Sequence, residues 1–190
     1  MHDNDNAGLD GGQQHRIGYG QALAERWFGE VYVLGTRNSG KDLDLDAFEV
    51  ELKHQLTEQG EYGSDWGLLF ELERSSELDI WELANTLIVA HDWGRWTGTA
   101  NLSLIYETGA DIGAEWETRL TAQLKYRRAA ELEPALELYM GENTRGLGPV
   151  LTGAWRLGDG EKLLWESGII FGLDTTTPDV NFKLNLEYEF

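Results

Sequence analysis

Several segments of this chain alternate between apolar and polar residues, and glutamates occupy many of the polar positions. Together such carboxylates would attract and hold cations. Hardly any basic residue occupies a matching position. The members of this set, which we call the acidic vestibule, are Glu49, Glu51, Glu71, Glu73, Glu82, Glu107 and Glu117. Charges of one sign in a low-dielectric wall concentrate counter-ions, so this set predicts an entrance that favours small neutral or cationic solutes.

A second set of polar positions, which we call the mixed-charge belt, carries both signs of charge. Its members are Lys53, Lys125, Arg127, Arg156, Glu166, Glu187 and Glu189. Opposite charges at one level of neighbouring strands form ion pairs, so we expect the belt to be largely self-paired. Two interpretations stay open. Either the acidic vestibule selects solutes, or the charges of both sets only satisfy one another inside a plugged, structural protein.

The residue pattern gives little support for catalysis or for a metal site. His54 and His91 fall on apolar stripes, and no serine occurs at a matching level to complete a phospholipase site. Residues 42–53, DLDLDAFEVELK, begin like a calcium-binding loop. The sixth position is Ala47 rather than glycine, and the twelfth is Lys53 rather than glutamate, so the pattern fails. We expect no enzyme activity, no metal and no cofactor.

Strands must position these charges, because about eleven segments alternate between apolar and polar residues. The clearest are WETRLTAQLKY at 116–126 and DWGLLFELE at 65–73, which both repeat the pattern of NFKLNLEYEF at 181–190. Alternate side chains of a strand lie on one face, so each segment has an apolar face and a polar face. Helical periodicity is absent, and single connections join successive segments. The sequence therefore predicts an all-β fold, an antiparallel up-and-down sheet of about eleven strands.

The segments have the dimensions of membrane-crossing strands. Each is close to the roughly 9–11 residues that a tilted strand needs to cross a bilayer, whereas the longest apolar runs, such as LIVA at 87–90, are far too short for a spanning helix. Aromatic residues recur at the ends of the apolar stripes, where membrane proteins place them. They are Trp66, Trp81, Trp96, Tyr106, Trp116, Tyr126, Trp155, Trp165 and Tyr188.

The connections alternate between two kinds. Compact ones, such as HDWGRW at 91–96, alternate with acidic ones rich in turn residues, such as ETGADIGAEWE at 107–117. Short turns on one side and longer loops on the other are typical of an outer-membrane barrel, whose short turns lie in the periplasm. The competing interpretation is a soluble β-sandwich or lipocalin-like barrel, which also alternates.

Composition limits the partners. The chain has 190 residues, enough for one sizeable domain, and a formal net charge of -19, so nucleic acid is an unfavourable partner. It has no cysteine, which excludes disulfides and thiolate metal sites. Its first residues are polar and acidic and lack the basic and apolar regions of a signal peptide.

The last strand resembles a known signal. Leu186, Tyr188 and Phe190 alternate and end on an aromatic, which is similar to the assembly signal of Gram-negative outer-membrane β-barrel proteins. Residues 168–190, with the loop motif Thr177-Pro178-Asp179, resemble the closing hairpin of a broad group of transporter-like and porin-like outer-membrane proteins of about twelve strands. The resemblance implies a location in the outer membrane with a periplasmic C-terminus. It also implies contact with outer-membrane lipid and lipopolysaccharide, and insertion by the barrel-assembly machinery.

The strand count leads to a further expectation. Bacterial single-chain barrels have an even number of strands with both termini in the periplasm. Counting back from a periplasmic Phe190, the first recognisable strand, at about 15–23, begins on the outside. We therefore expect a twelfth strand and a signal peptide upstream of Met1. Without that strand, the seam between the first and last visible strands should be imperfect or open. Residues 1–13 would be the remnant of an external loop, and residues 14–190 would form the barrel domain.

Overall fold

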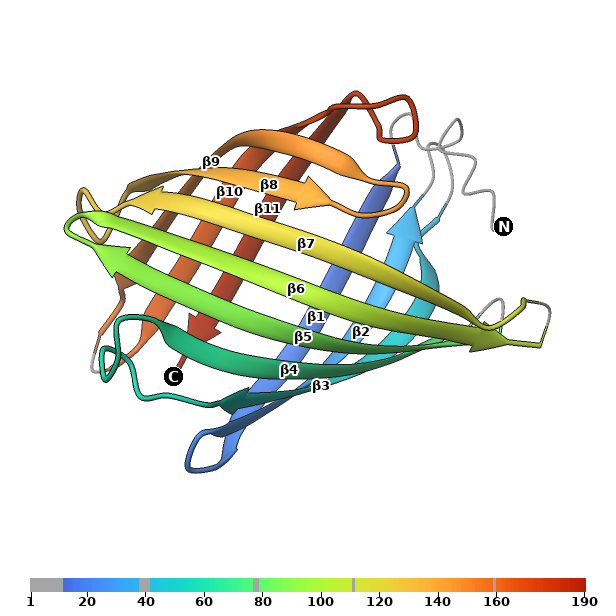
Figure 1. Ribbon diagram of the computed structural model, residues 1–190, viewed down its shortest axis with the longest axis horizontal. Coiled ribbons are helices and arrows are strands. Elements are labelled where there is room, and N and C mark those ends of the chain that lie inside the picture. The colour runs from blue at the N-terminus through green and yellow to red at the C-terminus, as the bar shows by residue number, and fades with distance from the viewer. Residues whose placement is uncertain (1–11, 38–41, 77–78, 111, 159) are drawn as a thin grey trace. The chain divides into compact units, whose positions relative to one another are not determined.

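Eleven antiparallel strands make up the secondary structure of the computed structural model, which describes residues 12–37, 42–76, 79–110, 112–158 and 160–190. The strands are β1 (Gln13–Ala24), β2 (Trp27–Arg37), β3 (Asp44–Gln55), β4 (Asp65–Ser75), β5 (Ile80–Trp93), β6 (Trp96–Gly109), β7 (Glu115–Tyr126), β8 (Glu133–Met140), β9 (Arg145–Arg156), β10 (Lys162–Gly172) and β11 (Val180–Glu189). They form one sheet in the order of the sequence (Figure 1). The predicted all-β, up-and-down fold is confirmed.

Helices are absent from the described ranges, and so is any helix that is long and apolar enough to cross a membrane. β1 and β11 stand at the two ends of the strand order. Most of the expected loop remnant, residues 1–11, lies outside the described residues. The upstream twelfth strand and the seam stay predictions.

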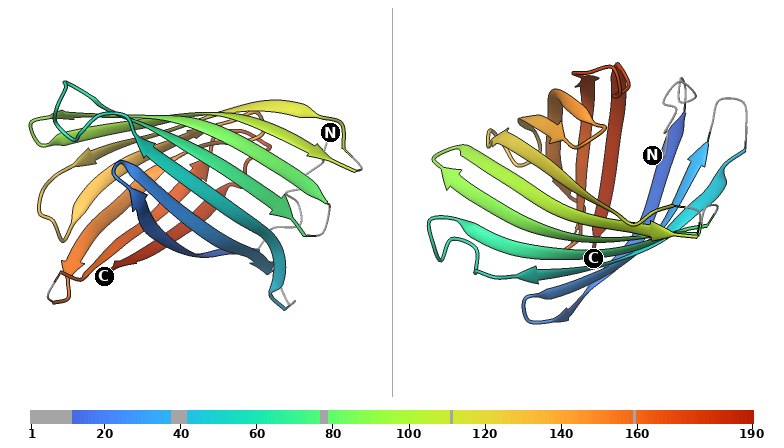
Figure 2. Two further views of the ribbon diagram at one scale, coloured as in Figure 1. Left: turned by 90° about the horizontal axis from the view of Figure 1, so that it is seen from below. Right: turned by 45° about the vertical axis from the view of Figure 1, so that its right-hand side comes forward.

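The chain divides into two compact units. The first contains Met1–Ile88 and Leu102–Arg119, and the second contains Val89–Asn101 and Leu120–Phe190. β1 to β4 therefore belong to the first unit and β8 to β11 to the second, while β5, β6 and β7 contribute to both. Strands curl within each unit, as Figure 2 shows.

Two of the connections are tight two-residue turns. Glu25 and Arg26 join β1 to β2, and Gly94 and Arg95 join β5 to β6. Arg26 has φ 65° and Gly94 has φ 63°. Two-residue hairpin turns need such left-handed backbone because its twist matches that of the flanking strands. These short connections make each strand pair antiparallel with its successor.

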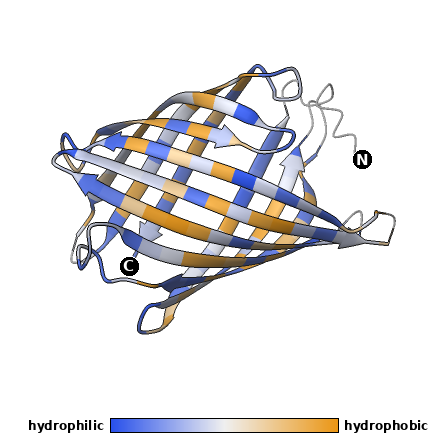
Figure 3. Cartoon of the chain, in the orientation of Figure 1, coloured by the Kyte–Doolittle hydropathy of each residue, from blue (hydrophilic) through white to orange (hydrophobic). Residues whose placement is uncertain are grey.

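The two faces of the strands are inverted relative to a water-soluble protein. On β11, Phe182 is 82% exposed and Leu184 is 70% exposed, whereas on β3 the carboxylate residues Glu49 and Glu51 are only 6% and 4% exposed. Soluble proteins bury large apolar side chains and almost never bury glutamate fully. Figure 3 shows the alternation of hydrophilic and hydrophobic residues along the strands. We call the two sides of each unit its polar face and its apolar face.

Candidate functional site

Two rows of polar side chains cross the polar face of the first unit from β2 through β3 to β4. Adjacent antiparallel strands bring residues in register within side-chain reach. The rows set by the register are Glu30–Glu51–Glu71 and Tyr32–Glu49–Glu73. Five glutamates therefore lie side by side, four of them from the acidic vestibule.

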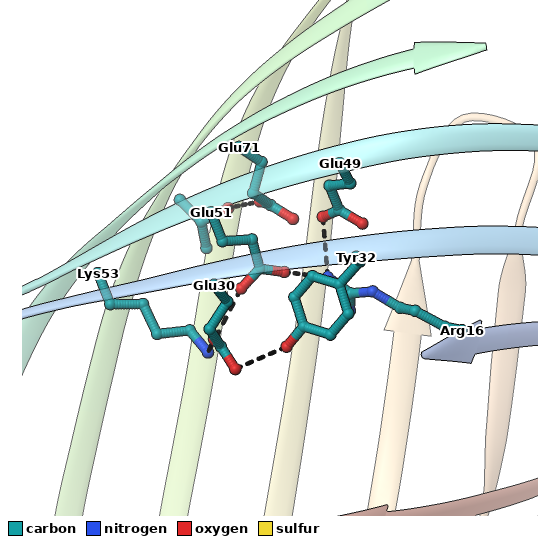
Figure 4. Close-up of polar contacts among 8 residues, drawn as sticks. Arg16, Glu30, Tyr32, Glu49, Glu51, Lys53 and Glu71 are labelled. Atoms are coloured by element: carbon teal, nitrogen blue, oxygen red, sulfur yellow. Dashed lines mark hydrogen bonds and ion pairs between the residues drawn. The ribbon is translucent and has the colours of Figure 1, made fainter. Parts of the chain in front are cut away.

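Arg16 of β1 neutralises much of this charge. Its Nη2 atom donates to Glu49 Oε1 at 2.9 Å and also to Glu51 Oε1, and the guanidinium lies 3.6 Å from the centre of the Tyr32 ring (Figure 4). The carboxylate side chains are 7% and 4% exposed, and that of Arg16 is 42% exposed. Because β2 lies between β1 and β3, these bonds reach across a strand, and the polar face of the first unit is concave.

Gly18 makes room for this contact. It faces Tyr32 in the register of β1 and β2, and a Cβ atom at Gly18 would lie 2.2 Å from Tyr32 Cδ1. The tyrosine ring therefore lies flat over the glycine, within reach of Arg16. The sequence analysis did not name Arg16 as a site residue. The signal was available, because in RIGYG at 16–20 Arg16 lies two positions before Gly18 and therefore on the same face of the strand.

Lys53 links the acidic vestibule to the mixed-charge belt. Its Nζ atom bonds Glu30 Oε2 and lies 3.3 Å from Glu51 Oε2, while the Tyr32 hydroxyl donates to Glu30 Oε1 at 2.7 Å (Figure 4). Glu51 thus contacts Arg16 on one side and Lys53 on the other. The sequence analysis treated these two sets as separate, whereas the structure joins them in one network.

Beside this network lies a pocket of about 200 Å³. Its lining residues are Arg16, Leu34, Glu49, Glu71, Glu73, Glu82 and Arg119. Four carboxylates and two guanidiniums give the lining a negative balance. Thr86 stabilises one of the carboxylates, because its hydroxyl lies 3.2 Å from Glu71 Oε2 and 2.7 Å from Ser103 Oγ. Arg119 is a second base that the sequence analysis left out of the acidic vestibule.

The other two vestibule residues, Glu107 and Glu117, do not line this pocket. Glu107 on β6 is near enough to Glu82 to interact with it electrostatically. Glu117 is half-buried and comes two residues before Arg119 on the polar face of β7. The structure therefore brings five of the seven predicted glutamates into the network or the pocket, and Glu107 into interaction with one of these five.

Lys183 organises the polar face of the second unit. Its Nζ atom donates to Glu137 Oε2 at 3.1 Å and to the Tyr139 hydroxyl at 3.0 Å, and pairs with Glu166 Oε1 at 2.5 Å. Gln123 Nε2 donates to Glu137 Oε1 at 2.7 Å. Lys183 on β11 reaches β8 across two intervening strands, so this polar face is also concave. Of these residues the sequence analysis named only Glu166 as a site residue.

Other residues of the mixed-charge belt form separate pairs. Lys125 lies 3.0 Å from Glu133, Lys162 lies 2.9 Å from Glu189, and Arg127 lies 2.9 Å from Asp92. The register places Arg156 opposite Lys162 and Glu187 opposite Leu164. In the part of the chain that the structure describes, no ion pair is recorded for Arg156 or Glu187.

Aromatic side chains pack in pairs at the ends of the apolar faces. In the first unit, Trp27 stacks on His54 with ring centroids 4.1 Å apart; in the second, His91 stacks on Trp93 at 5.4 Å. Both histidines therefore pack against indole rings on the apolar face. The predicted assembly signal lies on the same face, with Leu186 exposed and the Tyr188 and Phe190 rings 5.9 Å apart.

The motif Thr177-Pro178-Asp179 shapes the loop between β10 and β11. Asp174 Oδ1 accepts four hydrogen bonds, from the Thr177 hydroxyl at 2.7 Å, its amide at 2.9 Å, and the Thr176 hydroxyl and amide at 3.0 and 3.2 Å. These donors hold the pKa of Asp174 below its usual range, the Thr177 hydroxyl having the largest effect. Thr177 also accepts from the Arg145 amide at 2.7 Å, which ties the loop to β9.

Changing Thr177 to valine is expected to raise the pKa of Asp174 toward that of an ordinary aspartate, because the main donor to its carboxylate is lost. A lowered folded-state pKa stabilises the loop above the unfolded pKa, and this contribution disappears as the pH falls through the folded pKa. A carboxyl NMR titration in detergent micelles measures the change. Thr175→Val is the control, since Thr175 has no recorded bond to Asp174. Equal pKa values in the two variants would contradict the assignment.

Comparison with protein-family models and with curated proteins found no match to this chain. Carboxylate oxygens of Glu49, Glu51 and Glu71 all lie within 4.8 Å of one another, a spacing that suits a metal ion. Arg16 already donates to two of the three, so the cation at this position is a guanidinium. The surrounding cluster of carboxylates is suited to attracting cations.

Proposed function

We propose that this chain is an outer-membrane β-barrel protein that passes small neutral or cationic solutes along its polar face. The observation that carries the proposal is the inversion of the two faces. Leucines and aromatics point outward along the strands while Glu49 and Glu51 are buried on the inside. Exposing so large an apolar surface to water is unfavourable, whereas a bilayer solvates it. The stacked aromatic pairs at the strand ends support the same placement.

The charge of the pocket in the first unit supports the preference for cations. Its carboxylates outnumber its guanidiniums by four to two, so small anions are repelled. The bonded side chains of Arg16, Lys53 and Tyr32 occupy the polar face beside this pocket, which favours a narrow path. A narrow path lined by paired charges passes small solutes and excludes large ones.

A second candidate function is a structural barrel with a plugged interior that supports the envelope. The ion pairs favour it, because Arg16 and Lys183 each tie strands that are not neighbours in the sheet. Such bonds stiffen a wall and occupy the space that a solute would need. Conductance separates the two candidates, since a plugged barrel carries no current.

Single-channel recording of the full-length protein in planar bilayers tests the proposal. Under a potassium chloride gradient we expect a reversal potential that shows cation preference. Glu73→Gln combined with Glu82→Gln should reduce the cation-to-anion permeability ratio by about two- to tenfold, because two of four pocket charges are removed. Glu187→Gln, on the polar face of the second unit, is the control and should leave the ratio unchanged.

Three results would overturn the proposal. Absence of single-channel current favours the structural barrel, and anion preference contradicts the role given to the carboxylates. Purification of the full-length protein as a water-soluble monomer without detergent would remove the membrane from both candidates and favour a soluble β-sheet protein.

A further inference from the structure

An apolar groove of about 480 Å³ lies on the apolar face of the second unit, across β5 to β9. This volume falls within the roughly 300–1,000 Å³ typical of small-molecule sites. The side chains of its floor are small, while those of its walls are large. Its lining residues are Val89, His91, Trp93, Gly98, Thr99, Ala100, Ala122, Gln123, Leu124, Leu136, Leu138 and Leu147.

Small residues in the middle of the sheet create the groove. Ala122 pairs with Leu138 in the register of β7 and β8, so a methyl group lies beside an isobutyl group. Gly98 leaves space for Trp93, whose ring atom Cη2 would lie 2.7 Å from a Cβ atom at Gly98. The indole therefore lies low over β6 and forms the end wall near the turn that joins β5 to β6. One elongated apolar group fits between these walls.

Arginines gather beside this end of the groove. The Arg127 amide donates to the Arg95 carbonyl at 2.7 Å, which holds the end of β7 against the turn between β5 and β6. Arg127 also pairs with Asp92 at 2.9 Å and donates to the Gly94 carbonyl at 2.7 Å. The charge of Arg127 is thus compensated. Because the Arg127 amide bonds to Arg95, the next residue, Arg128, lies close to Arg95.

Arg95 and Arg128 are exposed, and within the described residues no ion pair is recorded for either guanidinium. Residues 91–96 and 126–131 together contain three arginines, Asp92 and Glu131, a net charge of +1 in a chain whose formal net charge is -19. The Trp96 and Tyr126 rings pack together at 5.0 Å between the two segments, at the level where membrane proteins place aromatic residues. An apolar groove thus ends at a local positive site.

We infer that the second unit binds one anionic glycerophospholipid of the surrounding bilayer, with an acyl chain in this groove and the phosphate at Arg95 and Arg128. Guanidinium groups recognise phosphate by paired, charge-assisted hydrogen bonds, and two uncompensated ones favour an anionic over a zwitterionic headgroup. The inference rests on the proposed membrane location and adds a specific lipid to it. It does not depend on whether the protein conducts solutes.

Native mass spectrometry of the full-length protein, released from nanodiscs containing equal amounts of phosphatidylglycerol and phosphatidylcholine, tests the inference. We expect one phosphatidylglycerol to stay bound preferentially, by about tenfold. Arg95→Gln with Arg128→Gln should abolish the preference without disturbing the fold, because both side chains are exposed. Ala122→Leu fills the groove floor and should reduce retention of both lipids. Arg26→Gln is the control, an exposed turn arginine that pairs with Glu58.

Each other outcome has a defined meaning. Equal retention of the two lipids, or equal loss of preference in Arg26→Gln and in the Arg95 and Arg128 variant, would overturn the lipid site while leaving the membrane location intact. A protein that does not enter nanodiscs and purifies without detergent would overturn the proposed location itself. Retention of a protein partner instead of lipid at the groove would assign this surface to an interface and also overturn the inference.

Discussion

Replacing Arg16 with methionine is expected to lower the free energy of unfolding by about 2–4 kcal/mol, because it leaves two buried carboxylates without their cation. Glu49 and Glu51 are 6% and 4% exposed, and both accept hydrogen bonds from the same guanidinium. Glu71 lies beside Glu51 in the register, so removal of Arg16 also exposes these carboxylates to mutual repulsion. The side chain of Arg16 is itself 42% exposed, which places the expected effect below that of a fully buried pair.

Equilibrium urea unfolding of the refolded protein in lipid or detergent measures this effect. Arg74→Met is the matched control, because Arg74 pairs with Asp79 at 2.8 Å but both side chains are more than half exposed. We expect the control to lose less than about 1 kcal/mol. Adding Glu49→Gln to the Arg16 variant should restore part of the stability. A loss no larger than that of the control would show that the buried carboxylates do not depend on Arg16.

Replacing Gly148 with alanine is expected to destabilise the sheet by about 3 kcal/mol or more, the upper end for overpacking. A Cβ atom at Gly148 would lie 1.8 Å from the Ile169 carbonyl oxygen and 2.7 Å from the Ile170 Cα atom. Both are backbone atoms, so β9 and β10 must separate to accept the methyl group. Pro149, the next residue of β9, has no amide hydrogen to donate. The pairing of β9 with β10 is interrupted here: after Gly168 and Val150, the next paired residues are Phe171 and Leu147.

A graded series of glycine variants tests this prediction by the same unfolding measurement. Gly168→Ala should cost less, because the nearest atom, at 2.6 Å, belongs to the side chain of Val150. Gly113→Ala should be neutral within about 0.5 kcal/mol, since nothing lies within 4 Å of its Cβ position. If the three variants unfold alike, β9 and β10 do not approach as closely as the structure places them.

The strand pattern and the identity of the two faces were predictable because they are local properties. The alternation in residues 181–190 places Leu184 and Leu186 on one side and Lys183 on the other without reference to any other strand, and β11 spans Val180–Glu189. The same argument predicted β7 at 116–126, where the structure has Glu115–Tyr126. Short connections then predict neighbours in sequence order, which the sheet confirms.

The partners of the charges were not predictable in the same way. The alternating pattern predicts that Arg16, Glu49 and Lys183 point to the polar face. It does not predict which other strands their side chains reach. Arg16 meets Glu51 across β2, and Lys183 meets Glu137 across β9 and β10. Both contacts depend on register and on curl within a unit, which the sequence pattern does not encode residue by residue.

The sequence by itself thus determined the fold class, the strand order and the side of the sheet on which each charge lies, because backbone geometry makes these consequences of period and turn length. Only the tertiary structure decided that Arg16 and Arg119 counter the acidic vestibule, and that Glu51 joins it to Lys53. The physical reason is that curvature shortens the distance between strands that are remote in sequence. Several charges that look unbalanced along the chain, such as those of Glu49 and Glu51, are therefore paired in space.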